Sequence, residues 1–351
     1  MNFTYQIDKS YQENYEQGPQ LGGVEVSVPF TDPKDFLGCS VGSRLGIAAG
    51  LLLNSKWIEA YAHLGFDLLT YKTVRSSYRP CYPLPNWVFI SDDSELEGPV
   101  YACSERPVDP RQVTSAVCFG MPSMAPDVWR KDVERAKSVL GAGQALIVSV
   151  VATPREGWGA EEIAGDFAVC ARWAAESGAD MIEANLSCPN VCTAEGSIYL
   201  DPRLSQKVAE AVKAACGNLP VLLKVGYFED RSLMRELLRQ TAKHVSGMTM
   251  VNGITRPVLH PNGDPVFGKD YVEAGVLGRG IHQASVDSVA TAVEIIDQEE
   301  LDLSLLAVGG AASVADIDDF FNVGADAVLA GSSPMYHPSL AAEAKAYCPQ
   351  W

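Results

Sequence analysis

The stretch LLAVGGAASVADIDDFFNVGADAVLAGSSP, residues 305–334, alternates two short apolar runs with one helical pattern. We predict a strand over Leu305–Val308, a helix over Val314–Asn322 and a second strand over Ala327–Ala330. Two strands joined by a helix in this way form a right-handed parallel βαβ unit. Small residues follow each strand directly, at the end where barrels built from such units place their functional loops.

The same alternation extends back through most of the chain. Near-continuous apolar runs are typical of parallel strands that are buried on both faces. We predict further strands over Leu45–Ala49, Leu68–Thr73, Ala145–Val151, Met181–Leu186, Val221–Val225 and Gly247–Val251. Helical patterns cover Asn54–Leu64, Val128–Leu140, Glu161–Ser177, Pro202–Cys216, Arg231–Lys243, Ala284–Asp297 and Pro338–Tyr347. Eight strands with intervening helices predict an α/β fold, the (β/α)8 TIM barrel, rather than a doubly wound open sheet.

We assign residues 41–351 to this barrel as a single domain, preceded by an irregular lead-in over residues 1–40. Two inserted excursions interrupt the alternation, at about residues 76–113 and 254–280. Prolines are frequent in the first excursion, which predicts loops and short strands there.

Composition excludes several classes of function. The 351-residue chain has a formal net charge of −17 and no run of Lys and Arg, which argues against a nucleic-acid partner. No stretch approaches the roughly 18 consecutive apolar residues of a membrane-spanning helix. The polar N-terminus lacks the apolar core of a secretory signal. We therefore expect a cytoplasmic protein without membrane association.

The cysteines do not form a recognisable framework. There are nine, an odd number, scattered along a large chain, so disulfides are not expected. Only Cys188 and Cys192 are close together, without CxxC spacing, and no HExxH pattern occurs. We predict no metal site, and we interpret the cysteines other than Cys188 as structural or incidental.

Glycines follow the last two predicted strands, in the segments AVGGAAS (307–313) and LAGSSP (329–334). In barrels, the loops after strands seven and eight often bind phosphate, because glycines let backbone N–H groups approach the anion. We therefore predict phosphate contacts from Gly309, Gly310, Gly331 and Ser332. A tight turn alone would also explain the Gly-Gly pair. No GxGxxG or P-loop pattern supports a dinucleotide or P-loop site.

Polar motifs lie at the ends of the other strands. Residues 185–190 read NLSCPN, KTV stands at 72–74 with PLP at 83–85, FGMP stands at 119–122, and Val251-Asn252 ends the sixth strand. Together these segments resemble the dihydroorotate dehydrogenase family in its class 1, cytosolic form. The resemblance runs from about residue 36 to residue 337, which is nearly the whole barrel.

The resemblance implies an FMN-dependent oxidation of dihydroorotate to orotate, a reaction of pyrimidine metabolism. Cys188 would be the base that removes a proton from the substrate carbon. Lys72 would act in catalysis and, with Lys224, stabilise negative charge on the reduced flavin. Residues 189–200 would form a lid. The implied cofactor contacts are Ala48, Ala49, Gly50, Lys72, Asn185, Lys224, Asn252, Gly278, Gly309, Gly310, Gly331 and Ser332, and the implied substrate contacts are Lys72, Gly120, Met121, Asn185, Asn190, Asn252 and Gly253.

Each of these residues also has a purely structural interpretation. A lone cysteine at a strand end is usually buried and inert, and Asn252 could simply cap a loop. Arg279 and His282 lie in or beside a plausible flavin-contacting loop, or at a helix start. The two lysines follow apolar strands, so they must find a partner or lie in a cleft, which favours a functional role.

Three positions depart from the family pattern. Val117 stands where the family has an Asn that contacts the substrate ring, Gly253 replaces a Ser or Thr, and Asn86 replaces an Arg. Leaving polar groups of a buried substrate unpaired costs several kcal/mol. Either other residues replace these polar groups, or the substrate is less polar or differently shaped. Arg75 and Arg79 are candidates for contacts to a substrate carboxylate, or they are surface residues.

Several alternatives therefore stay open. The first is a flavin ene-reductase or dehydrogenase that acts on a non-pyrimidine substrate in a specialised pathway. The second is a phosphate-binding isomerase without flavin, and Lys72 together with NLSCPN argues against it. The third is a noncatalytic FMN-binding or structural protein, and the presence of Cys188, Lys72 and Lys224 argues against it. The resemblance further implies a soluble electron acceptor or a separate electron-transfer subunit, and a homodimer.

Overall fold

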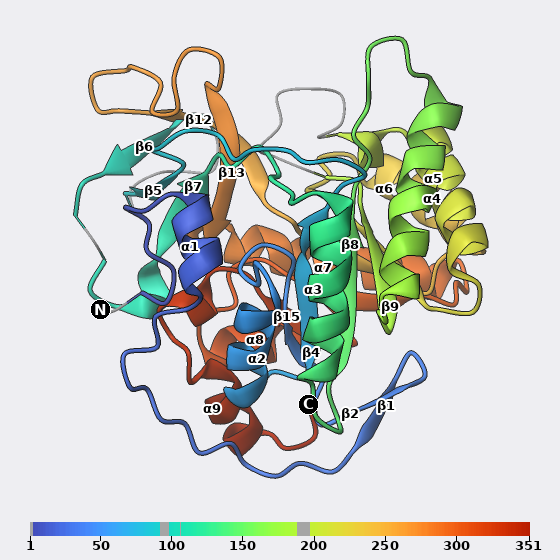
Figure 1. The fold of residues 1–351 in the computed structure, drawn as a ribbon, viewed down its shortest axis with the longest axis horizontal. Coiled ribbons are helices and arrows are strands. Elements are labelled where there is room, and N and C mark those ends of the chain that lie inside the picture. The colour runs from blue at the N-terminus through green and yellow to red at the C-terminus, as the bar shows by residue number, and fades with distance from the viewer. Residues whose placement is uncertain (1–2, 92–97, 106, 188–196) are drawn as a thin grey trace.

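The computed structural model describes residues 3–91, 98–105, 107–187 and 197–351. Eight parallel strands close into a barrel in the order β10-β11-β14-β15-β3-β4-β8-β9, which confirms the predicted TIM barrel (Figure 1). Their bounds are β3 (Leu45–Ile47), β4 (Leu68–Val74), β8 (Ala145–Val150), β9 (Met181–Asn185), β10 (Val221–Lys224), β11 (Gly247–Met250), β14 (Ser304–Ala307) and β15 (Ala327–Ala330).

Helices lie between the strands and surround the barrel (Figure 1). They are α2 (Ser55–His63), α3 (Pro126–Ser138), α4 (Ala160–Glu176), α5 (Pro202–Cys216), α6 (Arg231–Thr241), α7 (His282–Gln298), α8 (Val314–Asn322) and α9 (Leu340–Tyr347). Side-chain caps start several of them. Asn54, Asp201 and Ser313 each accept a hydrogen bond from a backbone N–H of the first helical turn. The predicted barrel strands and helices agree with these bounds to within two residues.

The two excursions form one structure. Strands β5 (Trp87–Ile90), β6 (Val100–Cys103) and β7 (Thr114–Val117) come from the first excursion and its end, and β12 (Ile254–Leu259) and β13 (Glu273–Gly278) come from the second. In the described part of the chain they close into a five-stranded sheet in the order β12-β13-β7-β5-β6. This sheet lies beside α1 at one end of the barrel (Figure 1).

The N-terminal segment has more regular structure than the expected irregular lead-in. Helix α1 (Tyr11–Gln17) begins at a capping box made by Ser10 and Glu13. Residues Phe3, Tyr5 and Tyr11 join the hydrophobic core. The backbone N–H of Thr4 donates to the carbonyl of Met335 at 2.8 Å, so the start of the chain is attached near its end.

The opposite end of the barrel is closed by a hairpin of β1 (Lys34–Phe36) and β2 (Cys39–Val41). Phe36 and Val41 belong to the small apolar cluster of the barrel interior, with Ala48, Leu68, Ala145, Ile147, Met181, Leu222, Leu306, Val308, Ala327 and Leu329. Ala48 and Val308 of this cluster lie at the carboxyl ends of β3 and β14.

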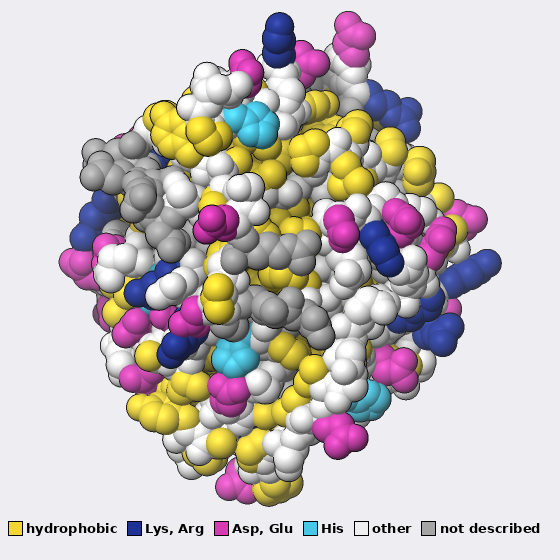
Figure 2. Space-filling view, turned by 90° about the vertical axis from the view of Figure 1, so that its left-hand side faces the viewer, with side chains coloured by type: hydrophobic (Ala, Val, Ile, Leu, Met, Phe, Trp, Pro, Cys, Tyr) yellow, Lys and Arg dark blue, Asp and Glu magenta, His cyan; other side chains and the backbone are white. Residues whose placement is uncertain are grey.

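On the face shown in Figure 2, acidic and basic side chains are interspersed, and hydrophobic side chains gather near the centre. No helix in the described ranges is long and apolar enough to cross a membrane.

Candidate active site

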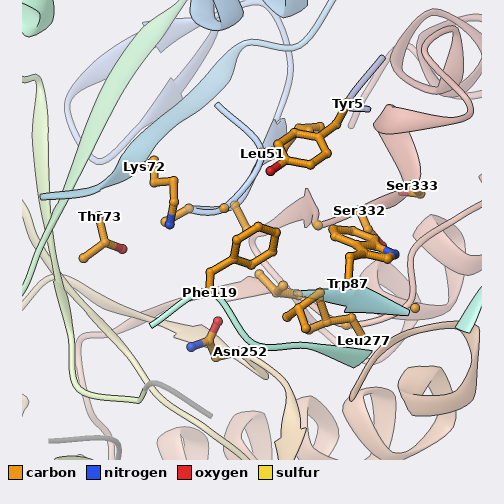
Figure 3. Close-up of a pocket in the computed structure, with 18 of the residues that line it drawn as sticks. Tyr5, Leu51, Lys72, Thr73, Trp87, Phe119, Asn252, Leu277, Ser332 and Ser333 are labelled. Atoms are coloured by element: carbon orange, nitrogen blue, oxygen red, sulfur yellow. The ribbon is translucent and has the colours of Figure 1, made fainter. Parts of the chain in front are cut away.

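A deep cavity opens at the carboxyl ends of the barrel strands, between the barrel and the five-stranded sheet. It encloses about 1180 Å³, including its open mouth. In Figure 3, Lys72, Thr73 and Asn252 lie on one side of the cavity, and Ser332 and Ser333 on the other.

The glycine-rich end is built from backbone. Gly309 and Gly310 follow β14 with φ of 128° and 79°, a region that favours glycine. A Cβ on Gly310 would lie 2.7 Å from the carbonyl oxygen of Gly278, and one on Gly309 would lie 2.0 Å from Ser285 Oγ. Only glycine therefore fits both positions, because a side chain at either one would collide with the protein packed against the loop.

Two side chains that lie outside the cavity support the loop that carries the glycine pair. His282, the first residue of α7, is buried, and its Nδ1 lies 3.4 Å from the carbonyl oxygen of Gly309. Its Nε2 lies 3.0 Å from Asp319 Oδ2. Arg279 pairs with the buried Asp316 at 2.8 Å. Arg279 and His282 are not among the residues that line the cavity, so they position the loop rather than contact its contents.

The opposite end is built from side chains. Asn185, the last residue of β9, donates from Nδ2 to Thr73 Oγ1 at 3.2 Å and accepts from the Ser187 N–H at 3.2 Å. Asn252 donates from Nδ2 to the carbonyl of Ser187. These contacts attach the side-chain amides of Asn185 and Asn252 to the backbone of Ser187, within the first half of the NLSCPN motif.

Two lysines supply positive charge at this end. Lys224 is 1% exposed and donates from Nζ to the carbonyl of Ala49 at 3.1 Å. Lys72 is partly buried, and its Nζ lies 6.0 Å from the centre of the Tyr11 ring. An anion or an electron-rich ring bound here would be stabilised by both ammonium groups, because a site that excludes water screens charge weakly.

All predicted cofactor contacts line this one cavity, together with Met121. Gly120 and Gly253 do not line it. Gly120 has a φ of 72° and packs against the ring of Tyr82, where a Cβ would lie 2.6 Å away. Cys188, Asn190 and most of the predicted lid lie outside the described residues.

Sequence reasoning missed much of the hydrophobic wall. Tyr5 and Tyr11 come from the N-terminal segment, and Trp87 and Leu277 come from the five-stranded sheet. Tyr5 packs against Trp57, Trp87 and Phe119, with ring centres 6.0–6.3 Å apart. Only the aromatic content of the first residues hinted at this role.

The two arginines after β4 do not replace the polar groups that the cavity lacks relative to the family pattern. Arg75 is fully buried and donates to the backbone carbonyls of Met121, at 3.1 Å, and Ala152, at 2.6 Å. It therefore fixes the FGMP loop against the end of β8. Neither Arg75, Arg79 nor Asn86 lines the cavity, whereas Val117 does and is 4% exposed.

The fold and the cavity define a TIM-barrel enzyme whose site lies at the carboxyl ends of the strands. The family model for dihydroorotate dehydrogenase matches residues 120–344. A dihydroorotate dehydrogenase of Dictyostelium discoideum is 35% identical over 96% of this chain and 95% of its own length. This chain belongs to the dihydroorotate dehydrogenase family. It is accordingly an oxidoreductase of a flavin-using family that acts on CH–CH bonds.

More distant relatives share parts or all of the barrel. The catalytic subunit of dihydroorotate dehydrogenase B (NAD(+)) from Staphylococcus carnosus is 26% identical over 46% of this chain and 50% of its own. A dihydroorotate dehydrogenase (quinone) from Polaromonas naphthalenivorans is 22% identical over 93% of this chain and 89% of its own. The crystal structure of DHODH in complex with ferulenol from Eimeria tenella has a TM-score of 0.73 at 14% identity, covering 95% of this chain and 86% of that one, which shows the shared fold.

Proposed function

We propose that the cavity binds FMN and that the enzyme oxidises dihydroorotate, or a closely related dihydropyrimidine, to its unsaturated product. The flavin supplies a two-electron acceptor for hydride. Gly309 and Gly310 line the cavity with a left-handed, closely packed backbone that only glycine adopts, and such a backbone lets a phosphate approach the main chain. The hydrophobic wall of the cavity suits a flat ring, and its polar end suits a small polar substrate.

The observation that carries the proposal is the convergence of four polar side chains at one end of the cavity. Lys72, Asn185, Lys224 and Asn252 come from β4, β9, β10 and the end of β11, and they line the same end of the cavity. The amides can donate to and accept from substrate carbonyls and N–H groups. The ammonium groups can stabilise negative charge that develops during hydride transfer.

Cys188 is the proposed base, on the strength of the NLSCPN motif. Its thiolate would take a proton from one substrate carbon while hydride leaves the neighbouring carbon. Cys188 directly follows Ser187 in the sequence, and the N–H of Ser187 donates to Asn185 at the polar end of the cavity. Low thiol pKa or a coupled proton path would make the thiolate available.

The first measurement is the anaerobic visible spectrum of the purified protein before and after adding dihydroorotate. We expect a flavin spectrum that bleaches. A spectrum that stays oxidised would refute dihydroorotate as substrate. Protein that contains no flavin and binds no added FMN would refute the whole proposal.

Replacing Cys188 with Ala tests the base. The variant should bind FMN as the parent does, and its flavin should be reduced about 10²–10⁴-fold more slowly, the usual contribution of a general base. Cys39→Ala, in the hairpin at the opposite end of the barrel, is the matched control, and its flavin should be reduced at the parental rate. Parental reduction of the Cys188→Ala variant would remove the cysteine from this role.

Val117 supports a second candidate, a dehydrogenase or ene-reductase that acts on a less polar, non-pyrimidine substrate. Its apolar side chain lines the cavity at the position where the family pattern has an amide. Screening cyclic enones and dihydropyrimidines for flavin oxidation or reduction separates the two candidates. The electron acceptor and the homodimer stay predictions from the resemblance.

A further inference from the structure

Glu183 is a carboxyl group inside the barrel that the proposed chemistry does not use. Its side chain is 0% exposed. Neither carboxyl oxygen has a hydrogen-bond partner among the described residues. A buried charge is costly unless an opposite charge compensates it, so an acid in this position calls for an explanation.

The alternation of β9 directs Glu183 into the barrel. Met181 belongs to the interior apolar cluster, whereas Ile182 and Ala184 pack outward against the helices. Glu183 therefore points inward, and so does Asn185, which reaches the cavity. The carboxyl group lies one layer below the floor of the cavity.

The other buried acids in the described ranges have cations. Asp67 pairs with Lys345 at 2.7 Å, and Asp316 pairs with Arg279 at 2.8 Å. Glu183 is the third acid that is buried in these ranges. A cation in the same interior is the physically expected complement.

Lys224 is such a cation. It lies on the adjacent strand β10, where Leu222 pairs with Glu183 and Lys224 pairs with Asn185. Leu222 belongs to the interior cluster, so Lys224, two residues further on, also points inward. The Nζ donates upward to Ala49 and lines the cavity. Charges buried in a low-dielectric interior interact over longer distances than charges at a surface.

We propose that Glu183 is the internal counter-charge of Lys224, and that it limits how strongly Lys224 stabilises negative charge on the bound flavin. Glu183 touches neither flavin nor substrate in this role and acts through the lysine. The layer of residues below the cavity thus tunes the reduction potential of the cofactor. This inference rests on the proposed binding of FMN.

The decisive test is the flavin midpoint potential of the Glu183→Gln holoenzyme, measured by equilibrium titration against a reference dye. Gln keeps the shape and removes the charge. We expect the ratio of reduced to oxidised flavin at fixed dye potential to rise roughly tenfold. Thr249→Val, which removes a buried hydroxyl from the strand on the other side of Lys224, should leave the ratio unchanged.

An unchanged or lowered ratio in Glu183→Gln would overturn the proposal, since it would mean that the carboxyl group carries no charge that the flavin senses. Protein without flavin would instead refute the proposed function. A mutant cycle checks the pairing without reference to the flavin's redox state. Glu183→Gln and Lys224→Met should each lower Tm, and the double variant should lower it by less than the sum. Additive Tm changes would also overturn the pairing.

Discussion

The two ends of the cavity differ in which parts of the chain form them, backbone at one end and side chains at the other. The phosphate end is backbone, shaped by Gly309, Gly310 and Gly331 in the last part of the chain. The polar end is side chain, contributed by strands spread from Lys72 to Asn252. The first end therefore depends on the shape of the backbone, and the second end depends on the chemical groups of its side chains. Substitutions should therefore affect cofactor retention at one end and turnover at the other.

The largest effect is expected at the phosphate end. Gly310→Val places a side chain 2.7 Å from the Gly278 carbonyl at a φ of 79°. Overpacking and left-handed strain together cost about 2–5 kcal/mol, so FMN affinity should fall by at least about 30-fold. Fluorescence titration of the flavin-free protein with FMN measures it.

Gly165→Ala in α4 is the control, because a Cβ on Gly165 meets no atom within 4 Å and this residue does not line the cavity. It should bind FMN nearly as the parent protein does. Equal losses in the two variants would show that the phosphate end is not shaped by the glycine pair.

An intermediate effect is expected at the polar end. Lys72→Met keeps the aliphatic stem and removes the charge, so FMN should be retained while flavin reduction slows about 100-fold, as when one electrostatic donor is lost. Stopped-flow absorbance gives the rate. Lys131→Met on the exposed face of α3 is the control. If Lys72→Met lost FMN but kept the parental rate of flavin reduction, the polar end would serve cofactor retention rather than turnover, which contradicts the proposed division.

The smallest effect concerns specificity. Val117→Asn combined with Gly253→Ser restores the family's polar residues, and we expect kcat/KM for dihydroorotate to rise about fivefold, equivalent to about 1 kcal/mol of hydrogen bonding. Steady-state assays on both proteins measure it. A fall would mean that the cavity is adapted to a different ring.

Much of the barrel was predictable because parallel strands buried on both faces leave a strong apolar signal, as in Val221–Lys224. The phosphate glycines and both lysines were predictable because they follow such strands. The five-stranded sheet was not, since β6 pairs with β12 across more than half of the barrel's sequence. Tyr5 and Glu183 were missed because only tertiary packing brings an N-terminal ring to the cavity or reveals a carboxyl without a partner.

The first and last barrel strands lie side by side, with Leu45 opposite Val328, and Thr4 is bonded to Met335. During synthesis, Tyr5 emerges from the ribosome long before Gly331 and Ser332. The cavity wall therefore cannot be complete until Ser332 has emerged. Cofactor capture must follow the synthesis of this segment, and every newly made molecule passes through a period in which its barrel is open between β3 and β15.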